Sequence, residues 1–158
     1  MLFRSDIVVN VQGDEPFVQK EPLEKLLQVF EGENGLKVQV ASLMQLMKEQ
    51  QFINDSNYVK VAVDKNMNAL FFSRSPIPYH RDKKFSPVYY EHIGVYAFRK
   101  QALLNFTAWP ITPLEAVEKI ECLRYLENGI PLKMVITQYM GIEIDTPEDL
   151  ERAASLLK

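Results

Sequence analysis

The feature that most constrains the fold is an apolar run near the start of the chain that passes directly into two acidic residues. Residues 7–11 are apolar at both alternating sets of positions, which predicts a strand covered on both faces, as in an α/β sheet. Gly13, Asp14, Glu15 and Pro16 follow, and the proline ends the strand. Ligands of open α/β sheets bind beyond the carboxyl ends of the strands. The run therefore predicts a binding site at Asp14.

Asp14 has the chemistry to bind a hard cation. Magnesium prefers a few carboxylate oxygens and completes its shell with water and substrate phosphates. A nucleoside triphosphate needs this charge compensation before a nucleophile can approach its phosphorus. Adjacent carboxylates before a proline are also common in solvated turns, so this segment alone leaves both interpretations open.

A second acidic segment lies near the end of the chain. Asp145 comes directly before Thr146, Pro147 and Glu148, a pattern typical of a helix N-terminus. Free backbone N–H groups and the helix dipole favour anions such as phosphate at such a place. On its own, this segment is equally consistent with a routine helix start.

Between these two segments, apolar periodicity and turn residues predict alternating helices and strands. Thr112, Pro113 and Glu115 form a strong helix start, and Asn128-Gly129 is its expected stop. We expect helices at 22–30, 48–53, 99–106, 112–127 and from 146 onward, strands at 36–44, 58–63, 69–73, 92–98 and 131–137, and a proline-punctuated loop at 75–82. The two strands at 58–63 and 69–73 are expected to form a hairpin.

Composition excludes several classes of protein. The 158 residues are 47% hydrophobic and carry a net charge of −3, so a folded core is expected and a nucleic-acid partner is not. Cys122 is the only cysteine, which excludes an intramolecular disulfide and a cysteine zinc site and favours a reducing cytoplasm. The chain shows no signal peptide and no apolar run of the roughly 20 residues that span a bilayer, so no membrane association is expected.

Several short segments, in order along nearly the whole chain, carry a family resemblance. They are residues 9–16, 72–78, 92–96, Pro113-Leu114-Glu115 with Glu118 and Glu121, 126–129 and 145–150. Together they resemble the successive signatures of the CMP-KDO synthetases, the 3-deoxy-manno-octulosonate cytidylyltransferases of lipopolysaccharide synthesis. The resemblance implies an α/β nucleotidyltransferase fold, a homodimer, and a reaction in which the anomeric hydroxyl of KDO attacks the α-phosphorus of CTP and expels pyrophosphate.

The resemblance also implies roles for individual residues. Asp14 and Asp145 match the two metal-binding aspartates of the family, which hold the catalytic Mg²⁺. A sugar acid needs a cation for its carboxylate and mixed donors and acceptors for its hydroxyls. The positions that match the family's sugar-acid pocket are Gln12, Arg74, Arg81, His92, Tyr96 and Glu121.

Each of these side chains also has a plainer interpretation when it is taken singly. Arg74 and Arg81 would be surface charges, His92 a hydrogen-bonded structural residue, and Tyr96 a core residue with its hydroxyl at the surface. The three glutamates at 115, 118 and 121 would form a solvated helix face.

The family pattern includes an N-terminal strand and phosphate-binding loop that this sequence lacks. We therefore expect residues 1–158 to form a single N-terminally truncated α/β domain with an incomplete Rossmann-like sheet and a hairpin and loop region for substrate binding and dimerisation. Such a chain is expected to be inactive and prone to aggregate unless another chain completes it. Cys122 replaces the family's usual glutamine, which bears on the choice between KDO and an amino-substituted analogue.

Two other functions remain open from the sequence. One is a glycosyltransferase of related architecture, although its usual acidic motif separates the two aspartates by a residue, whereas Asp14 and Glu15 are adjacent. The other is a non-catalytic fragment that serves in dimerisation or interaction, against which the presence of both metal-type aspartates argues weakly.

Overall fold

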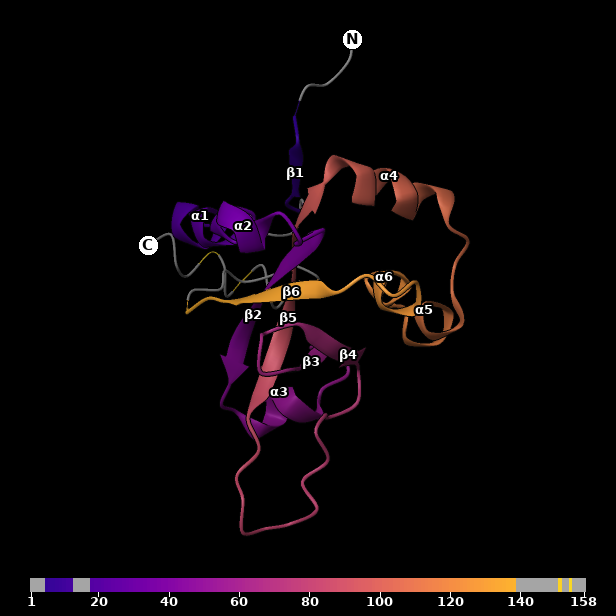
Figure 1. The fold of residues 1–158 in the computed structure, drawn as a ribbon. Helices are drawn as coiled ribbons and strands as arrows, with labels where there is room; N and C mark the ends of the chain where they lie inside the picture. The colour runs from indigo at the N-terminus through magenta and orange to yellow at the C-terminus, as the bar shows by residue number, and fades with distance from the viewer. Residues whose placement is uncertain (1–4, 13–17, 139–150, 152–153, 155–158) are drawn as a thin grey trace.

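A long strand, β5 (Tyr89–Arg99), organises the sheet of the computed structural model, which describes residues 5–12, 18–138, 151 and 154. One edge of β5 pairs antiparallel with β2 (Val40–Met47). Opposite ends of its other edge pair antiparallel with β1 (Ile7–Asn10) and β3 (Lys60–Val63). The strand thus holds three neighbours in register (Figure 1).

Two further strands extend this sheet outward. β4 (Ala69–Ser73) pairs antiparallel with β3, and β6 (Leu132–Ile136) pairs parallel with β2. The order in the described part of the chain is β4-β3-β5-β2-β6, with β1 beside β5. The result is an open mixed α/β sheet, as the sequence predicts.

Helices cover both faces of the sheet because β2 and β5 bury apolar side chains in both directions. One apolar cluster joins Ile93, Val95 and Ala97 of β5 to the region of α1 (Lys20–Gln28). The other cluster joins Phe98 to helices on the opposite face. Helices α4 (Lys100–Ala108), α5 (Pro113–Glu118) and α6 (Leu123–Glu127) lie on this second side, while α1 and α2 (Gly32–Gly35) lie on the first (Figure 1).

The expected hairpin is confirmed, and its turn shows why these residues form one. The Asp64 carboxylate accepts hydrogen bonds from the backbone N–H groups of Asn66 and Asn68, each at 2.8 Å, and from the Asn68 side chain at 3.0 Å. Beyond β4, residues 74–88 contain no helix or strand, which confirms the loop predicted at 75–82, and they project from the body of the molecule (Figure 1). Helix α3 (Gln50–Asn54) occupies the expected place before β3.

The prediction of one continuous helix over 112–127 is wrong. Thr112 and Pro113 do start a helix, but α5 ends at Glu118 because Lys119 adopts a left-handed conformation with φ 57°. The chain then turns before α6 begins at Leu123. Gly129, with φ +73°, follows the end of α6, as the Asn-Gly signal predicted. The expected strands at 36–44 and 92–98 are present with shifted bounds.

The covered strand expected at residues 7–11 is only partly buried. Within the described residues β1 pairs with β5 alone, and a hollow of about 520 Å³ lies beside it, lined by Ser5, Ile7, Val8, Val9 and Lys100. The helix expected from residue 146 lies outside the described residues, apart from positions 151 and 154. No helix in the described part of the chain is both long and apolar enough to cross a bilayer.

Candidate active site

A cavity of about 250 Å³ lies between the sheet and the helices α4 and α6. Its wall combines apolar and aromatic side chains with a few polar groups. The residues that line it are Val8, Val9, Asn10, Gln12, Tyr96, Phe98, Leu103, Phe106, Glu121, Cys122 and Tyr125. A concave site with an apolar floor and few convergent polar groups is the usual form of a small-molecule site.

Strand alternation places one set of β5 side chains, including those of Tyr96 and Phe98, on the cavity side. His92, Gly94, Tyr96 and Phe98 occupy alternate positions, and Ile93, Val95 and Ala97 face the other cluster. Tyr96 pairs in register with Asn10 of β1. Gln12 follows β1 and lies over Gly94, where an added Cβ would come within 3.5 Å of its amide nitrogen.

Three of the predicted site residues meet at this cavity although they are far apart in sequence. Gln12 comes from the end of β1, Tyr96 from β5 and Glu121 from the turn between α5 and α6. They offer an amide, a phenol and a carboxylate, which together can donate and accept hydrogen bonds. This set suits a ligand that carries several hydroxyl groups.

Tyr96 and Cys122 both lie in the wall of the cavity. Burial raises the pKa of the Cys122 thiol to about 12 and raises the pKa of the Tyr96 phenol as well. Both groups are therefore neutral near pH 7, and Cys122 contributes no thiolate nucleophile. Cys122 is 2% exposed, so the thiol is buried.

His92 lies behind Tyr96 and does not line the cavity. Its ring contacts the rings of Phe72 and Tyr96, and its Nε2 is 3.1 Å from Ser42 Oγ. Ser42 Oγ has one proton, which faces the carbonyls of Ile93 and Val95 at 2.9 Å, so the hydroxyl oxygen accepts from a protonated Nε2. Burial lowers the pKa of His92 to about 3, and the ring is neutral at physiological pH.

Arg74 and Arg81 do not line this cavity. Arg74 follows β4, and its guanidinium donates to backbone carbonyls of Ser56, Glu118 and Lys119. Arg81 is exposed within the projecting residues 74–88. Asp14 and Asp145, the predicted metal ligands, lie outside the described residues, and in the described part of the chain no group of three or more His, Cys, Asp or Glu side chains could hold a metal ion.

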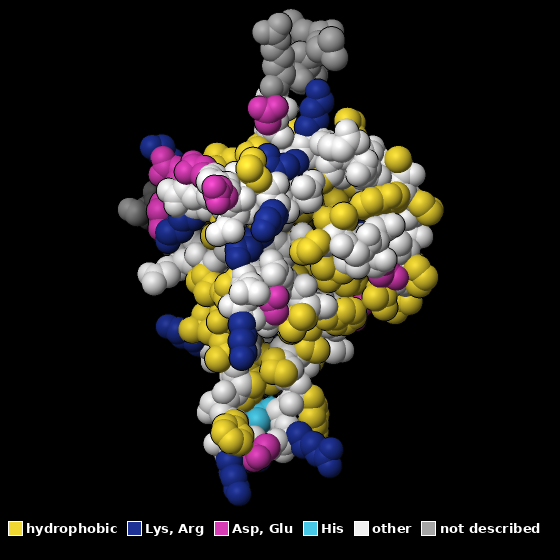
Figure 2. All heavy atoms as spheres, in the orientation of Figure 1, with side chains coloured by type: hydrophobic (Ala, Val, Ile, Leu, Met, Phe, Trp, Pro, Cys, Tyr) yellow, Lys and Arg dark blue, Asp and Glu magenta, His cyan; other side chains and the backbone are white. Residues whose placement is uncertain are grey.

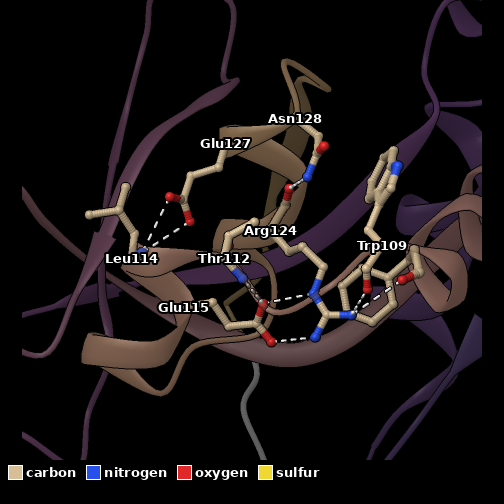
Figure 3. A network of polar contacts seen from close by, with 8 residues as sticks. Trp109, Thr112, Leu114, Glu115, Arg124, Glu127 and Asn128 are labelled. Atoms are coloured by element: carbon tan, nitrogen blue, oxygen red, sulfur yellow. Dashed lines mark hydrogen bonds and ion pairs between the residues drawn. The ribbon is translucent and has the colours of Figure 1, made fainter.

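The interpretation of the three glutamates as one solvated face is wrong for two of them. Glu115 is 6% exposed and forms an ion pair with Arg124 of α6 (Figure 3). Glu118 accepts hydrogen bonds from Ser73 Oγ and Arg74 N. Only Glu121 is exposed, at the cavity.

The sequence reasoning missed the aromatic floor of the cavity. Phe98 and Phe106 each stack on Tyr125, with ring centroids 5.9 Å and 5.0 Å from that of Tyr125. Period-two alternation from Tyr96 could have identified Phe98. No pattern in the sequence indicates that Phe106 and Tyr125, which lie on helices, pack against the sheet.

Comparison with known proteins identifies first the fold and then the family of this chain. The sheet and its helices define a nucleotidyltransferase-type α/β protein. The solved structure of CMP:2-keto-3-deoxy-manno-octonic acid synthetase complexed with CTP matches this fold with a TM-score of 0.90. The two sequences are 34% identical, and the match covers 98% of this chain and 62% of that chain. The family described as Cytidylyltransferase matches residues 1–150. The chain belongs to the cytidylyltransferase family.

Two similar curated proteins share the same name. The 3-deoxy-manno-octulosonate cytidylyltransferase of Flavobacterium johnsoniae is 56% identical over 97% of this chain, and that of Christiangramia forsetii is 55% identical over 96%. The chain spans 63% and 61% of the length of these two relatives.

Proposed function

We propose that this chain belongs to an enzyme that transfers the cytidylyl group of CTP to KDO, giving CMP-KDO and pyrophosphate for lipopolysaccharide synthesis. The observation that carries the proposal is the convergence of Gln12, Tyr96 and Glu121 on one cavity in a chain of the cytidylyltransferase family. The names of the curated relatives support the choice of CTP and KDO as substrates.

In this proposal, different residues bind different groups of the sugar. Gln12 and Glu121 bind hydroxyls of KDO, and Tyr96 offers its phenol to the same ligand. The neutral ring of His92 supports Tyr96 from behind. Arg81 does not line the cavity, but its exposed guanidinium is chemically suited to the carboxylate of the sugar acid and is assigned to it in this proposal.

Magnesium completes the proposed chemistry. Asp14 and Asp145 hold it, because carboxylate oxygens are the ligands that it prefers. When bound, the ion compensates the charge of the triphosphate and stabilises the leaving pyrophosphate. With the cation held by these two aspartates, the two substrates would be oriented for reaction.

A cytoplasmic homodimer is the proposed assembly. The projecting residues 74–88 expose Tyr79, Phe85 and Val88, which are 85%, 74% and 53% accessible. Figure 2 shows basic side chains at the tip of the molecule where this segment lies. Exposed aromatic groups on a projecting segment support its packing against a second copy of the chain. Replacement of Tyr79 and Phe85 by serine should then shift the sedimentation of the protein to that of a monomer.

A chimera tests the proposed reaction. The region of the Flavobacterium johnsoniae enzyme that matches this chain is replaced by residues 1–158, and pyrophosphate release from CTP is measured with and without KDO and Mg²⁺. We expect release that needs both, and mass spectrometry should identify CMP-KDO. Asp14→Asn and Asp145→Asn serve as matched inactive variants that keep the fold.

One result would overturn the proposed function. A folded chimera that binds CTP but releases no pyrophosphate with KDO would exclude it, and hydrolysis of a pre-made nucleotide sugar would favour a glycosyltransferase. Full activity of both aspartate variants would refute the metal assignment.

A further inference from the structure

The break between α5 and α6 decides where Glu121 and Cys122 lie. Helix α5 ends at Glu118, Lys119 takes a left-handed conformation, and the turn brings both residues to the cavity wall. A non-glycine residue in this conformation costs about 1–2 kcal/mol, so other contacts must hold the break in place.

Contacts from the end of β4 surround this break. The Glu118 carboxylate accepts hydrogen bonds from Ser73 Oγ at 2.8 Å and from the backbone N of Arg74 at 2.9 Å. In return, Arg74 Nε donates to the carbonyl of Glu118 at 2.8 Å, and Nη2 donates to that of Lys119 at 3.5 Å. The last carbonyls of a helix have no partner within the helix, and Arg74 supplies one.

A third contact anchors the arginine to the sheet. Arg74 Nη1 donates to the carbonyl of Ser56 at 2.9 Å, just before β3. In the same segment, the carbonyls of Asp55 and Tyr58 accept hydrogen bonds from the buried Lys60 at 2.7 Å and 2.6 Å. The guanidinium thus connects a rigid turn beside β3 to the end of α5.

We infer that Arg74 and Glu118 are positioning residues, which act on the substrate pocket by fixing the 119–122 turn and with it Glu121 and Cys122. Arg74 does not line the cavity, and three of its nitrogens already donate to carbonyls. Three of the five guanidinium N–H groups are thus committed to carbonyls outside the cavity.

Thiol labelling tests this inference without any substrate. Cys122 is the only cysteine and is 2% exposed, so its reaction with a thiol reagent reports opening of the turn. Arg74→Met should label about tenfold faster than the unmodified chain under native conditions, after correction for global unfolding measured in urea. Glu118→Gln, which keeps the shape of the side chain, should label faster by a smaller factor.

Arg99→Met is the matched control. Arg99 also donates to backbone carbonyls, those of Val38 at 2.9 Å, Gly35 at 2.8 Å and Phe30 at 3.4 Å, but it does so on the α1 side of the sheet. It should leave the corrected labelling rate near that of the unmodified chain. Equal corrected rates in Arg74→Met and Arg99→Met would overturn the inference.

Kinetics separate positioning from direct binding, and this readout rests on the proposed function. In the chimera, Arg74→Met should lower kcat/KM about tenfold, but by less than about twofold when Glu121→Gln is already present. Fully additive effects would identify Arg74 as an independent ligand and refute the inference. If the chimera has no activity, the proposed function fails while the labelling result still decides the positioning role.

Discussion

Arg124 of α6 holds Glu115 of α5 in an ion pair that is almost removed from solvent. The Arg124 Nε donates to Glu115 Oε2 at 2.7 Å, a second nitrogen contacts Oε1, and the two side chains are 12% and 7% exposed. The guanidinium also donates to the carbonyls of Phe106 and Trp109 and lies 4.1 Å from the ring centre of Phe106 (Figure 3). One side chain therefore joins α4, α5 and α6.

Removal of Arg124 should destabilise the fold strongly. Arg124→Met leaves the Glu115 carboxylate buried without its counter-charge, and we expect a loss of about 3–5 kcal/mol in the free energy of unfolding. Urea denaturation followed by circular dichroism measures it. The control is Lys20→Met, which breaks a surface pair with Glu24 whose side chains are 87% and 54% exposed, and it should cost less than about 1 kcal/mol. Equal losses in the two variants would contradict the prediction.

The same ion pair predicts a dependence of stability on acid. The hydrogen bond from Arg124 holds the pKa of Glu115 below its usual range. The pair therefore contributes fully above the unfolded value of about 4.3, and this contribution disappears as the pH falls through the lower folded value. The stability difference between the unmodified chain and Glu115→Gln should shrink on acidification below about pH 4. A difference that stays constant from neutral to acid pH in urea titrations would refute this.

The absence of a side chain at Gly94 should determine where the Gln12 amide lies. An added methyl would lie 3.5 Å from the Gln12 amide nitrogen, which is an ordinary contact, so Gly94→Ala should resemble the parent. Gly94→Val adds bulk that displaces the amide, and in the chimera we expect KM for KDO to rise about tenfold with little change in KM for CTP. The fold should persist, because valine favours strands. An unchanged KM for KDO in the valine variant would place Gln12 outside the sugar contacts.

Cys122 should resist modification in the folded chain. Because its pKa is raised to about 12, only about one thiol in ten thousand is ionised at pH 8. A thiol reagent should therefore react slowly in buffer and rapidly in denaturing urea, where the thiol recovers its usual pKa of about 8.5. Rapid reaction of the native chain at pH 8 would show that the thiol is not held as described.

The sequence predicted local structure where residues make their own contacts. The turn at Asp64 and the loop after β4 follow from side chains that act within a few positions. The end of α5 was missed because it depends on Glu118, Ser73 and Arg74, which meet only when the sheet has formed. Helix periodicity carries no information about such distant partners.

In the candidate site, too, the structure brings some of the predicted residues together but not others. Gln12, Tyr96 and Glu121 were predicted from a family pattern, and the structure brings them to one cavity. The guanidinium of Arg74 was predicted for the same pocket but donates to carbonyls outside it. Residue type alone does not distinguish a guanidinium that binds a ligand from one that binds backbone.

The pairing of β5 with β1, β2 and β3 has a consequence for how the chain opens. Release of β5 from the sheet breaks ladders on both of its edges, whereas β1 and β4 each detach with the loss of one ladder. In deuterium exchange the amides of β5 should therefore be the last to exchange. The strand that carries Tyr96 would then remain ordered while β1, with Gln12 beyond its end, adjusts around an incoming molecule.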